Sequence, residues 1–503
     1  MTGSGTLADP YIIYDADDLQ AVQNDLAAYY ELADDIDASA TSTWNGGLGF
    51  LPIGLWVNWG AAVPAVPYIA CAGVNWKQTP FTGHFDGKGH SISDLTIHRT
   101  QVAAPTTTCP DWDSVGLFSH LGDGAVVQNL TLENVDIDGY QCVGALAGQV
   151  YTQAGIITLS NCSSSGTVDG EHDDTGGLIG LTSGYAAETI TISSCFSSAN
   201  VTADDNVGGL VGLNYQADLD GCYATGTVDA VGVGVATGFY AGGLIGSCYG
   251  VSEITESYAT GAVTGNNHGV GGLIGVADGS VIDDCYAAGN VSGDHNVGGL
   301  VGCTRVTAVT IGQSFATGGV TATYQAGGLV GYADVETAID RSFATGDITC
   351  GNLGGWSAAG GLIGEHDSGP VTDSYARGNV TATGEYVGGL VGYNIGDIDR
   401  CYSTGAVAGS AIVGGLVGDS DGTVDDSFWD TDTSGTLVSD GGTGQTTAQM
   451  KTPATFVTAA WDFGTDWWMT GASNDGYPCL LDVTPSCAMG AVACTSNPLI
   501  LFL

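Results

Sequence analysis

The sequence predicts an all-β protein, a parallel β-helix (solenoid) of about eleven coils. The main observation is a Val-Gly-Gly-Leu-Val-Gly segment at residues 207–212, which recurs at intervals of 26 to 34 residues. A period of this size is typical of units that cannot bury their apolar face alone and must stack on neighbours. We expect the recurring leucines to form an inward structural ladder: Leu178, Leu210, Leu244, Leu273, Leu300, Leu329, Leu362, Leu390 and Leu416.

An aromatic residue marks a second position in each period, as at Tyr223 and Tyr258. Three short apolar segments per period, separated by Gly, Asn, Asp and Ser, predict three strands and three turns. Equivalent side chains of successive coils would then form ladders at about 4.8 Å spacing. The Gly-Gly pair is expected either to adopt a positive φ or to let the backbone pack closely.

The predicted regions follow in chain order. Residues 1–54 form an N-terminal cap with a short helix, because apolar residues between Asp17 and Leu32 have helical spacing. Residues 55–113 break the period and are interpreted as first coils with long, aromatic-rich inserted loops. Residues 114–430 hold the regular repeats, and residues 431–503 form an irregular C-terminal cap with an apolar attachment tail.

These segments resemble the GLUG-motif repeats of surface proteins and adhesins. The flanks resemble them too, at residues 81–90 (Phe-Thr-Gly-His-Phe-Asp-Gly-Lys-Gly-His) and from Ser427-Phe428-Trp429-Asp430 onwards. The resemblance covers roughly residues 4–482. It implies a surface or adhesin-type β-solenoid and brings no catalytic residues, since the motif is structural.

The charge balance is strongly acidic, with 54 Asp and Glu against 8 Lys and Arg. Such a chain would be repelled by phosphates, so we expect no nucleic-acid partner and no binding to an anionic membrane surface. An ordinary acidic extracellular protein is one interpretation. A protein built for multimolar salt, where charges are screened within about 3 Å, is the other, and the scarcity of lysine favours it.

No export signal is visible at the start of the sequence, and no apolar run is long enough to span a membrane. A surface-type solenoid without a signal peptide suggests a virion component assembled in the host cytoplasm. A chain trimmed of its leader is the alternative. The expected location is therefore extracellular or on a virion surface.

Tryptophans of the irregular region are candidate binding residues, because loops on a rigid scaffold often carry binding sites and aromatic rings suit carbohydrate or protein contacts. Packing beneath the loops themselves is an equally open interpretation. The expected partner is a host cell-surface glycan or glycoprotein. These candidates are Trp56, Trp59, Trp76 and Trp112.

The C-terminal end is the candidate attachment point, because the chain closes with five apolar residues after Pro498. Such a segment is expected to pack on its own last coil, on a second copy in a homo-oligomer, or on another virion or surface protein.

Turns before the Gly-Gly pair are rich in acids and histidines. Oxygen ligands at this density could hold Ca²⁺ or Mg²⁺, although solvated turns explain them without a metal, and no cofactor is required. The metal candidates are Asp173, Asp174, Asp204, Asp205, Asp294 and His295.

Cysteines alternate with serines immediately before the aromatic position, which indicates a ladder of small side chains rather than a disulfide framework. Disulfides are plausible for Cys71 with Cys109 and for two of Cys479, Cys487 and Cys494. Two positions before the aromatic, a row of residues, all but one of them charged, is expected to be exposed and to support register: Glu256, Asp284, Gln313, Arg341, Asp373, Arg400 and Asp426.

Taken together, these features predict a non-enzymatic surface recognition or adhesion protein. We favour a receptor-binding, tail-fibre or spike component of a virus from a halophilic (archaeal) system. A cellular surface adhesin with the same fold is the first alternative. A β-helix polysaccharide-degrading enzyme is the second, but the repeat face offers almost no Arg or Lys for lyase chemistry, and acids are too common to mark a hydrolase pair.

Overall fold

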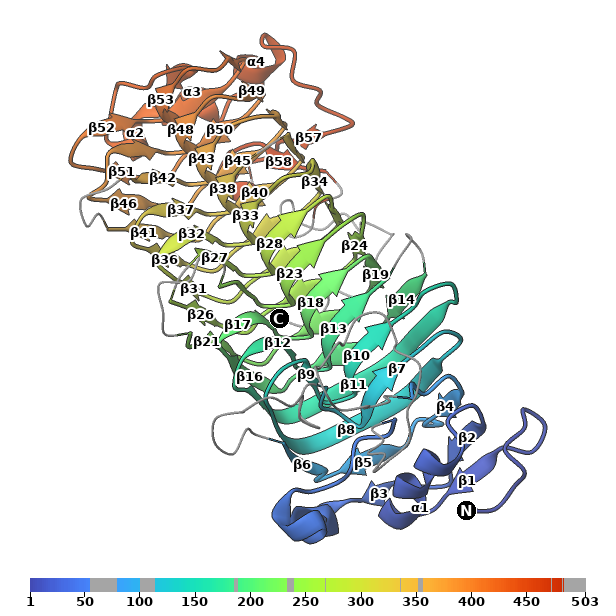
Figure 1. Cartoon of the computed structure of the whole chain (residues 1–503). Helices are drawn as coiled ribbons and strands as arrows, with labels where there is room; N and C mark the ends of the chain where they lie inside the picture. Colours follow the sequence, from blue (N-terminus) through green and yellow to red (C-terminus); the bar gives the residue numbers. More distant parts are fainter. Residues whose placement is uncertain are drawn as a thin grey trace.

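The computed structural model describes residues 1–54, 79–99, 114–184, 189–232, 239–266, 268–334, 336–351, 356–471, 473–481 and 483. Figure 1 shows one long stack of strands between the N-terminal elements and the C-terminal helices. Strands of successive coils pair in parallel, in sheets of 35, 11 and 10 strands. The predicted all-β parallel solenoid of about eleven coils is therefore confirmed.

The 11-stranded and 10-stranded sheets lie on either side of the Gly-Gly pairs. The first contains β7 (Phe118–Leu121), β10 (Ala147–Tyr151), β13 (Ile179–Ser183), β18 (Val211–Tyr215), β23 (Ile245–Tyr249), β28 (Ile274–Asp278), β33 (Val301–Thr304), β38 (Val330–Ala333), β43 (Ile363–His366), β48 (Val391–Asn394) and β53 (Val417–Ser420). The second contains β9 (Val143–Gly144), β12 (Asp173–Gly176), β17 (Asp205–Gly208), β22 (Ala241–Gly242), β27 (His268–Gly271), β32 (His295–Gly298), β37 (Gln325–Gly327), β42 (Ala358–Gly360), β47 (Tyr386–Gly388) and β52 (Ile412–Gly414).

Residues 205–230 illustrate how one coil is built. After β17 and β18 come three strands of the largest sheet, namely β19 (Ala217–Asp220), β20 (Tyr223–Ala224) and β21 (Val228–Ala230). The prediction of three strands per coil is thus wrong for this coil, because five form. Left-handed residues divide the apolar segments at corners, with φ of 62° at Gln216 and 59° at Gly221.

The charged row before the aromatic position forms one of these corners. Each of its seven residues, from Glu256 to Asp426, has a φ between 42° and 52°. The predicted exposure is wrong at Asp373, which is only 5% exposed because the C-terminal part of the chain packs over it. Arg400 reaches this carboxylate from the next coil, with Nη2 2.6 Å from Asp373 Oδ2.

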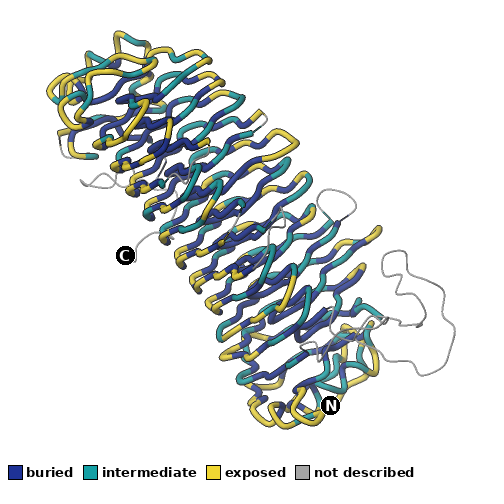
Figure 2. Tube along the Cα trace, turned by 60° about the vertical axis from the view of Figure 1, so that its left-hand side comes forward, coloured by how far each residue is buried: buried dark blue, intermediate teal, exposed yellow. Residues whose placement is uncertain are grey.

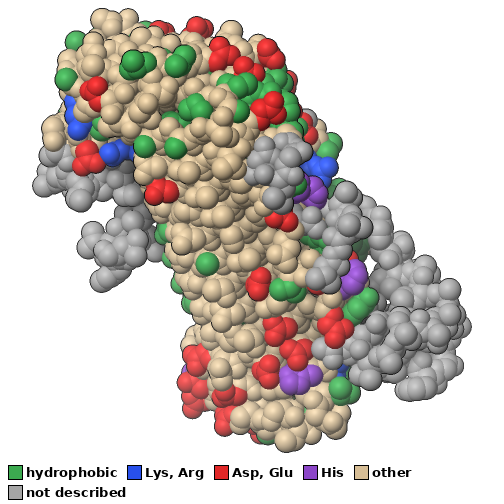
Figure 3. All heavy atoms as spheres, turned by 90° about the vertical axis from the view of Figure 1, so that its left-hand side faces the viewer, with side chains coloured by type: hydrophobic (Ala, Val, Ile, Leu, Met, Phe, Trp, Pro, Cys, Tyr) green, Lys and Arg blue, Asp and Glu red, His purple; other side chains and the backbone are tan. Residues whose placement is uncertain are grey.

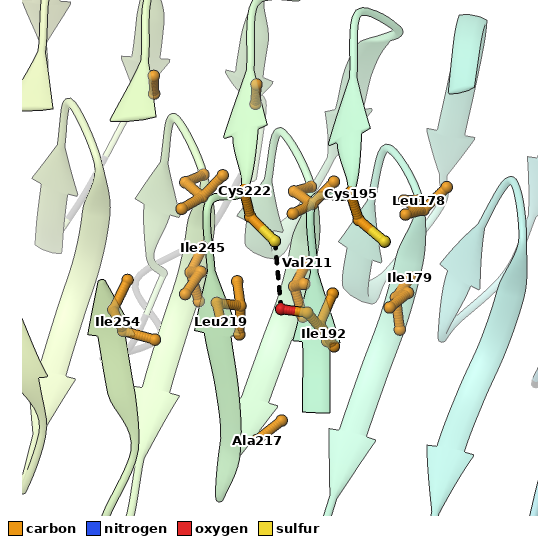
Figure 4. Packing of buried hydrophobic residues seen from close by; sticks show 14 of the residues in the cluster. Leu178, Ile179, Ile192, Cys195, Val211, Ala217, Leu219, Cys222, Ile245 and Ile254 are labelled. Atoms are coloured by element: carbon orange, nitrogen blue, oxygen red, sulfur yellow. Dashed lines mark hydrogen bonds between the residues drawn. The ribbon is translucent and has the colours of Figure 1, made fainter. Parts of the chain in front are cut away.

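The recurring leucines point into the stack, and each of the nine is fully buried. Figure 2 shows buried backbone along the length of the solenoid, with exposed residues concentrated at corners and ends. Figure 4 shows the packing inside, where Leu178 and Leu219 share the core with Ile192, Val211 and Ile245.

The Gly-Gly pairs serve close packing and do not adopt a positive φ. A Cβ added to Gly208 would lie 1.9 Å from the carbonyl oxygen of Val211 in the same coil. One added to Gly209 would lie 2.1 Å from the carbonyl oxygen of Gly243 in the next coil. Of the two predicted roles, close approach is confirmed and left-handed turning is wrong.

Cysteines and serines exchange inside the same ladder, as predicted. The Cys222 thiol donates to the Ile192 carbonyl at 3.4 Å, which is the dashed contact in Figure 4. In the next coil the Ser257 hydroxyl donates to the Thr255 carbonyl at 2.7 Å and accepts from the Cys222 amide at 3.0 Å. Cys479 is disulfide-bonded. The other predicted disulfide cysteines, Cys71, Cys109, Cys487 and Cys494, lie outside the described residues.

Aromatic rings stack along the outside of the solenoid in a continuous column. From Phe196 to Tyr402, neighbouring ring centroids are 4.6 to 5.0 Å apart and the ring planes differ by at most 9°. The first rings, from Phe196 to Tyr286, are partly exposed. Towards the C-terminal end the rings become buried, and Tyr402 is fully covered.

The C-terminal part of the chain folds back and covers this end of the aromatic column. It comprises α2 (Thr431–Ser434), α3 (Thr447–Met450), α4 (Pro453–Val457) and the antiparallel strands β57 (Trp467–Trp468) and β58 (Cys479–Leu480). Trp467 is fully buried, and its Nε1 donates to Asp373 Oδ1 at 2.8 Å. Tyr402 donates its hydroxyl proton to the Pro478 carbonyl at 2.6 Å. The predicted apolar attachment tail lies outside the described residues.

The N-terminal helix is shorter than the sequence pattern suggests. α1 (Ala16–Gln20) and the 3₁₀ turn η1 (Ala21–Asn24) form, and Asp15 caps the helix by accepting from the Asp18 amide at 2.9 Å. The helical prediction is wrong for Tyr29–Leu32, which forms strand β2 and pairs in parallel with β1 (Tyr11–Ile13) and β4 (His84–Asp86). Pairing with two neighbouring strands outweighs the local helical spacing.

The buried leucine ladder gives a first prediction. Replacing Leu300 by Asp should lower the free energy of unfolding by at least about 3 kcal/mol, because a carboxylate would be buried without a partner. Thermal melting and limited proteolysis in native salt measure the effect. Thr310→Asp is the matched control, since Thr310 is exposed on β34 (Val309–Gly312) and should tolerate the charge. Equal melting of both variants would contradict the inward position of the leucine.

Candidate functional site

The predicted binding tryptophans Trp56, Trp59, Trp76 and Trp112 all lie outside the described residues. Their role therefore stays a prediction. Two other regions of the described chain gather chemically distinctive side chains: the acidic corner between β12 and β17, and an aromatic patch near β43 and β48.

The acidic corner contains four of the six predicted metal candidates, including Asp204, whose backbone amide donates to the His172 carbonyl at 3.3 Å. Asp173 and Asp205 are register partners on β12 and β17, and Asp174 follows Asp173. Asp294 and His295 lie several coils away, where the His295 ring is 4.6 Å from the His268 ring and 4.0 Å from that of Tyr324. The candidates therefore do not form one site, and metal binding stays a prediction.

Asp174 is the most unusual carboxyl group of this corner. It is 8% exposed, accepts from the Asn206 amide nitrogen at 2.8 Å and contacts the Cys142 thiol at 3.8 Å. Burial is the main cause that raises its pKa to about 7, against the hydrogen bond from Asn206. Burial likewise raises the pKa of Asp205 to about 6. The corner thus holds two carboxyl groups that bind protons unusually tightly.

Two groups missed by the sequence reasoning bring three ligand atoms within 4.8 Å of one another in the described residues. One contains Asp34, Asp35 and His90, and the other His98, Asp136 and Asp138. His98 and Asp138 are register partners on β6 (Thr96–Arg99) and β8 (Val126–Gly139). The sequence shows Asp136 and Asp138 two residues apart, a spacing that places both side chains on one face of a strand. His98 is distant in the sequence and reaches them because β6 pairs with β8.

The aromatic patch, which we define as Trp356, Tyr386, Tyr393 and Glu365, was not anticipated either. The Trp356 ring centroid lies 4.8 Å from that of Tyr386 and 5.1 Å from that of Tyr393, which it meets edge-on at 87°. Trp356 Nε1 donates to Glu365 Oε2 at 3.0 Å, and the tryptophan remains 42% exposed. A large apolar ring is therefore held in place at the surface.

The charged side chains of the protein are mainly acidic, with 54 Asp and Glu against 8 Lys and Arg. Figure 3 shows carboxylates distributed over the face in view, with few lysines or arginines among them. Most described arginines are engaged with acids: Arg341 pairs with Asp340, Arg377 with Asp475 and Arg400 with Asp373. No helix among the described residues has the length and apolar character needed to cross a membrane.

The protonated acidic corner gives a second prediction. The folded-state pKa of Asp174 lies near 7 and the ordinary value is 3.8. The contribution of this group to the free energy of unfolding is therefore fully present below about pH 4, declines as the pH rises from there, and is lost once the pH has passed about 7. Asp174→Asn should remove this loss and stabilise the protein by on the order of 4 kcal/mol above pH 7. Melting across this pH range measures it. Asp229→Asn on the exposed face of β21 is the control; equal pH profiles for both variants would contradict the assignment.

Comparisons with known proteins agree with this architecture. The model of the GLUG motif matches residues 205–229, 266–292 and 383–408. Each match corresponds to one coil, beginning near the strand before the Gly-Gly pair and ending at the last strand of the same coil. The motif is therefore one turn of the solenoid.

Two relatives share much of the chain. Halomucin of Haloquadratum walsbyi is 37% identical over 81% of this chain, which corresponds to 5% of halomucin. A protein of Evansella cellulosilytica described as a Gly-rich membrane protein is 32% identical over 95% of this chain and 45% of its own length. The chain thus spans less than half of either relative.

Among solved structures, a Bacteroides ovatus protein described as an immunoglobulin A1 protease is 17% identical, with a TM-score of 0.28 over 95% of this chain and 94% of that one. An IgA1 protease gives 15% identity and a TM-score of 0.33 over 71% of this chain and 21% of that one. These scores are too low to support any inference about activity. Three coils of this solenoid are thus GLUG-motif repeats.

Proposed function

We propose that this chain is a non-enzymatic surface protein for recognition or adhesion, in which the solenoid is a stiff scaffold and its flank carries the binding groups. The observation that carries the proposal is Trp356 of the aromatic patch, which is exposed on an acidic solenoid and is held by a hydrogen bond to Glu365. Large aromatic side chains anchored at a surface are typical of binding sites. The names of the two relatives, halomucin and a Gly-rich membrane protein, support a location at a cell surface.

The absence of catalysis is also part of the proposal. Hydrolysis of a glycosidic bond needs a proton-donating carboxyl that a substrate can reach. Two carboxyls of the acidic corner have suitably raised pKa values. Asp174 is 8% exposed and is held by Asn206 and Cys142, and Asp205 accepts from the backbone amides of Asn206 and Tyr240. The raised pKa values of both groups are therefore better explained by burial within the fold than by a role in chemistry.

Adaptation to strong salt follows from the formal net charge of −46. At low ionic strength this charge opposes the compact state, whereas molar salt reduces the range of each charge to about 3 Å. The 37% identity to halomucin is consistent with this proposal.

A second candidate places the same protein on a virion, as a receptor-binding or tail-fibre component. No observation of the described residues favours it, and the names of the relatives favour a cellular surface adhesin. Immunogold labelling of cells and of purified particles from one culture distinguishes the two.

The proposed function predicts saturable binding to cell envelopes. Fluorescently labelled protein should bind envelope preparations of a halophilic archaeon in molar salt without releasing soluble sugars. Leu300→Asp, which disrupts the coils, is the control for unspecific adsorption. Binding that does not saturate, or that the disrupted variant retains, would contradict recognition, and release of oligosaccharides would contradict the non-enzymatic assignment.

The charge balance gives a separate prediction. The melting temperature should fall steadily as KCl is reduced from molar to millimolar concentration, because the repulsion between carboxylates is then unscreened. Sucrose at matched water activity is the control for excluded-solute effects. A melting temperature that does not change with salt would contradict adaptation to strong salt.

A further inference from the structure

The aromatic patch extends along the solenoid because outward side chains of successive coils are in register. Tyr332, Glu365, Tyr393 and Asp419 are consecutive register partners on β38, β43, β48 and β53. Neighbouring strands lie about 4.8 Å apart, so this column alternates a phenol with a carboxyl group at that spacing. Tyr386 approaches from the adjoining sheet, on β47, with its ring 5.1 Å from that of Tyr393. The aromatic patch together with Tyr332 and Asp419 is therefore several coils long, and we call this longer feature the strip.

The polar groups of the strip are fixed by hydrogen bonds. Glu365 accepts from Trp356 and, at 3.4 Å, from the Gln325 side-chain amide. The Tyr393 hydroxyl donates to Asp421 Oδ2 at 3.0 Å, and the Tyr332 hydroxyl donates to Asp367 Oδ2 at 2.7 Å. These bonds orient the rings before any ligand arrives, which lowers the entropy cost of binding.

The chemistry of the strip selects its ligand. Ionised carboxylates accept hydrogen bonds and donate none, so they favour a ligand rich in donors and repel an anion. The exposed tryptophan and the half-buried Tyr332 and Tyr393 offer apolar surface with polar edges, whereas Tyr386 is buried beside them. A sugar ring has both features, since its hydroxyl groups donate hydrogen bonds and one of its faces presents C–H groups.

A cationic ligand would also match the acids, but two observations weigh against it. Glu365, the carboxyl that contacts the tryptophan, already accepts two hydrogen bonds, and burial raises its pKa. In molar salt, attraction between separated charges is largely screened, whereas stacking on an aromatic ring is a contact interaction.

We infer that the strip around Trp356 binds an uncharged oligosaccharide, with one sugar ring stacked on the indole and hydroxyl groups donating to the carboxylates of the strip. This inference rests on the proposed recognition function and adds the ligand class and its position. The strip runs along the column, so a chain of several sugar rings can lie across successive coils.

The test uses the full chain in molar salt and a panel of neutral, anionic and amine-bearing oligosaccharides, together with a lysine-rich peptide. Titration calorimetry should show binding of at least one neutral oligosaccharide by the wild-type protein. Trp356→Ala should weaken that binding at least tenfold without changing the melting temperature. Tyr393→Phe, which keeps the ring and removes its hydroxyl, should weaken it less. Trp468→Ala is the matched control, because Trp468 is 47% exposed but lies on β57 in the C-terminal part of the chain.

Several outcomes would overturn the inference: no neutral oligosaccharide binds, Trp356→Ala binds as tightly as Trp468→Ala, or the lysine-rich peptide binds best through the same tryptophan. The inference and the proposed function can fail separately. Envelope binding that Trp356→Ala retains would reject the strip and keep the recognition function. Oligosaccharide binding that depends on Trp356, in a protein that does not adhere to envelopes, would keep the strip and reject adhesion.

Discussion

The close approach of adjacent coils at each Gly-Gly pair determines how every coil sits on the next. At Gly209 the space for a Cβ is occupied by the carbonyl oxygen of Gly243, and at Gly243 by that of Gly272. A larger residue at either position would have to push two backbones apart. Because this contact recurs from coil to coil, it holds parallel strands in one register. The leucine, cysteine and aromatic ladders are consequences of that register, since equivalent positions are superposed.

Much of this fold could be predicted from the sequence, because a repeat displays the same physical requirement many times. The inward leucine and the small position occupied by Cys222 or Ser257 were both recognisable in this way. Features that depend on backbone conformation were not. In the row before the aromatic position, the left-handed residues are acids, one amide and arginines, so residue type does not mark that corner. The strand at Tyr29–Leu32 has helical spacing, and its two strand partners decide its structure.

The candidate site was harder to predict because its members come from different coils. Trp356 lies outside the repeated positions, and its neighbours Glu365, Tyr386 and Tyr393 are 9 to 37 residues away in the sequence. The register of β43 with β48 places Glu365 beside Tyr393, and the register of β42 with β47 places Tyr386 beside Ala358, two residues after the tryptophan. In the acidic corner, Asp173 and Asp205 could be recognised in the sequence as acidic residues of turns, but the burial of Asp174 could not.

Register also creates an electrostatic difficulty, which the aromatic strip resolves. In an acidic chain, columns of superposed residues place carboxylates in adjacent coils about 4.8 Å apart, where two charges repel by roughly 0.9 kcal/mol even in water. In the strip, Tyr393 separates Glu365 from Asp419. The carboxylates are then two coils apart along the column, and the repulsion falls to roughly 0.4 kcal/mol. Stacking of the coils thus favours an aromatic ring between two acids, because the ring keeps the carboxylates apart. The same alternation of residues places apolar rings beside hydrogen-bond acceptors on the surface. A recognition surface of this composition can arise on an acidic solenoid without any change to its core.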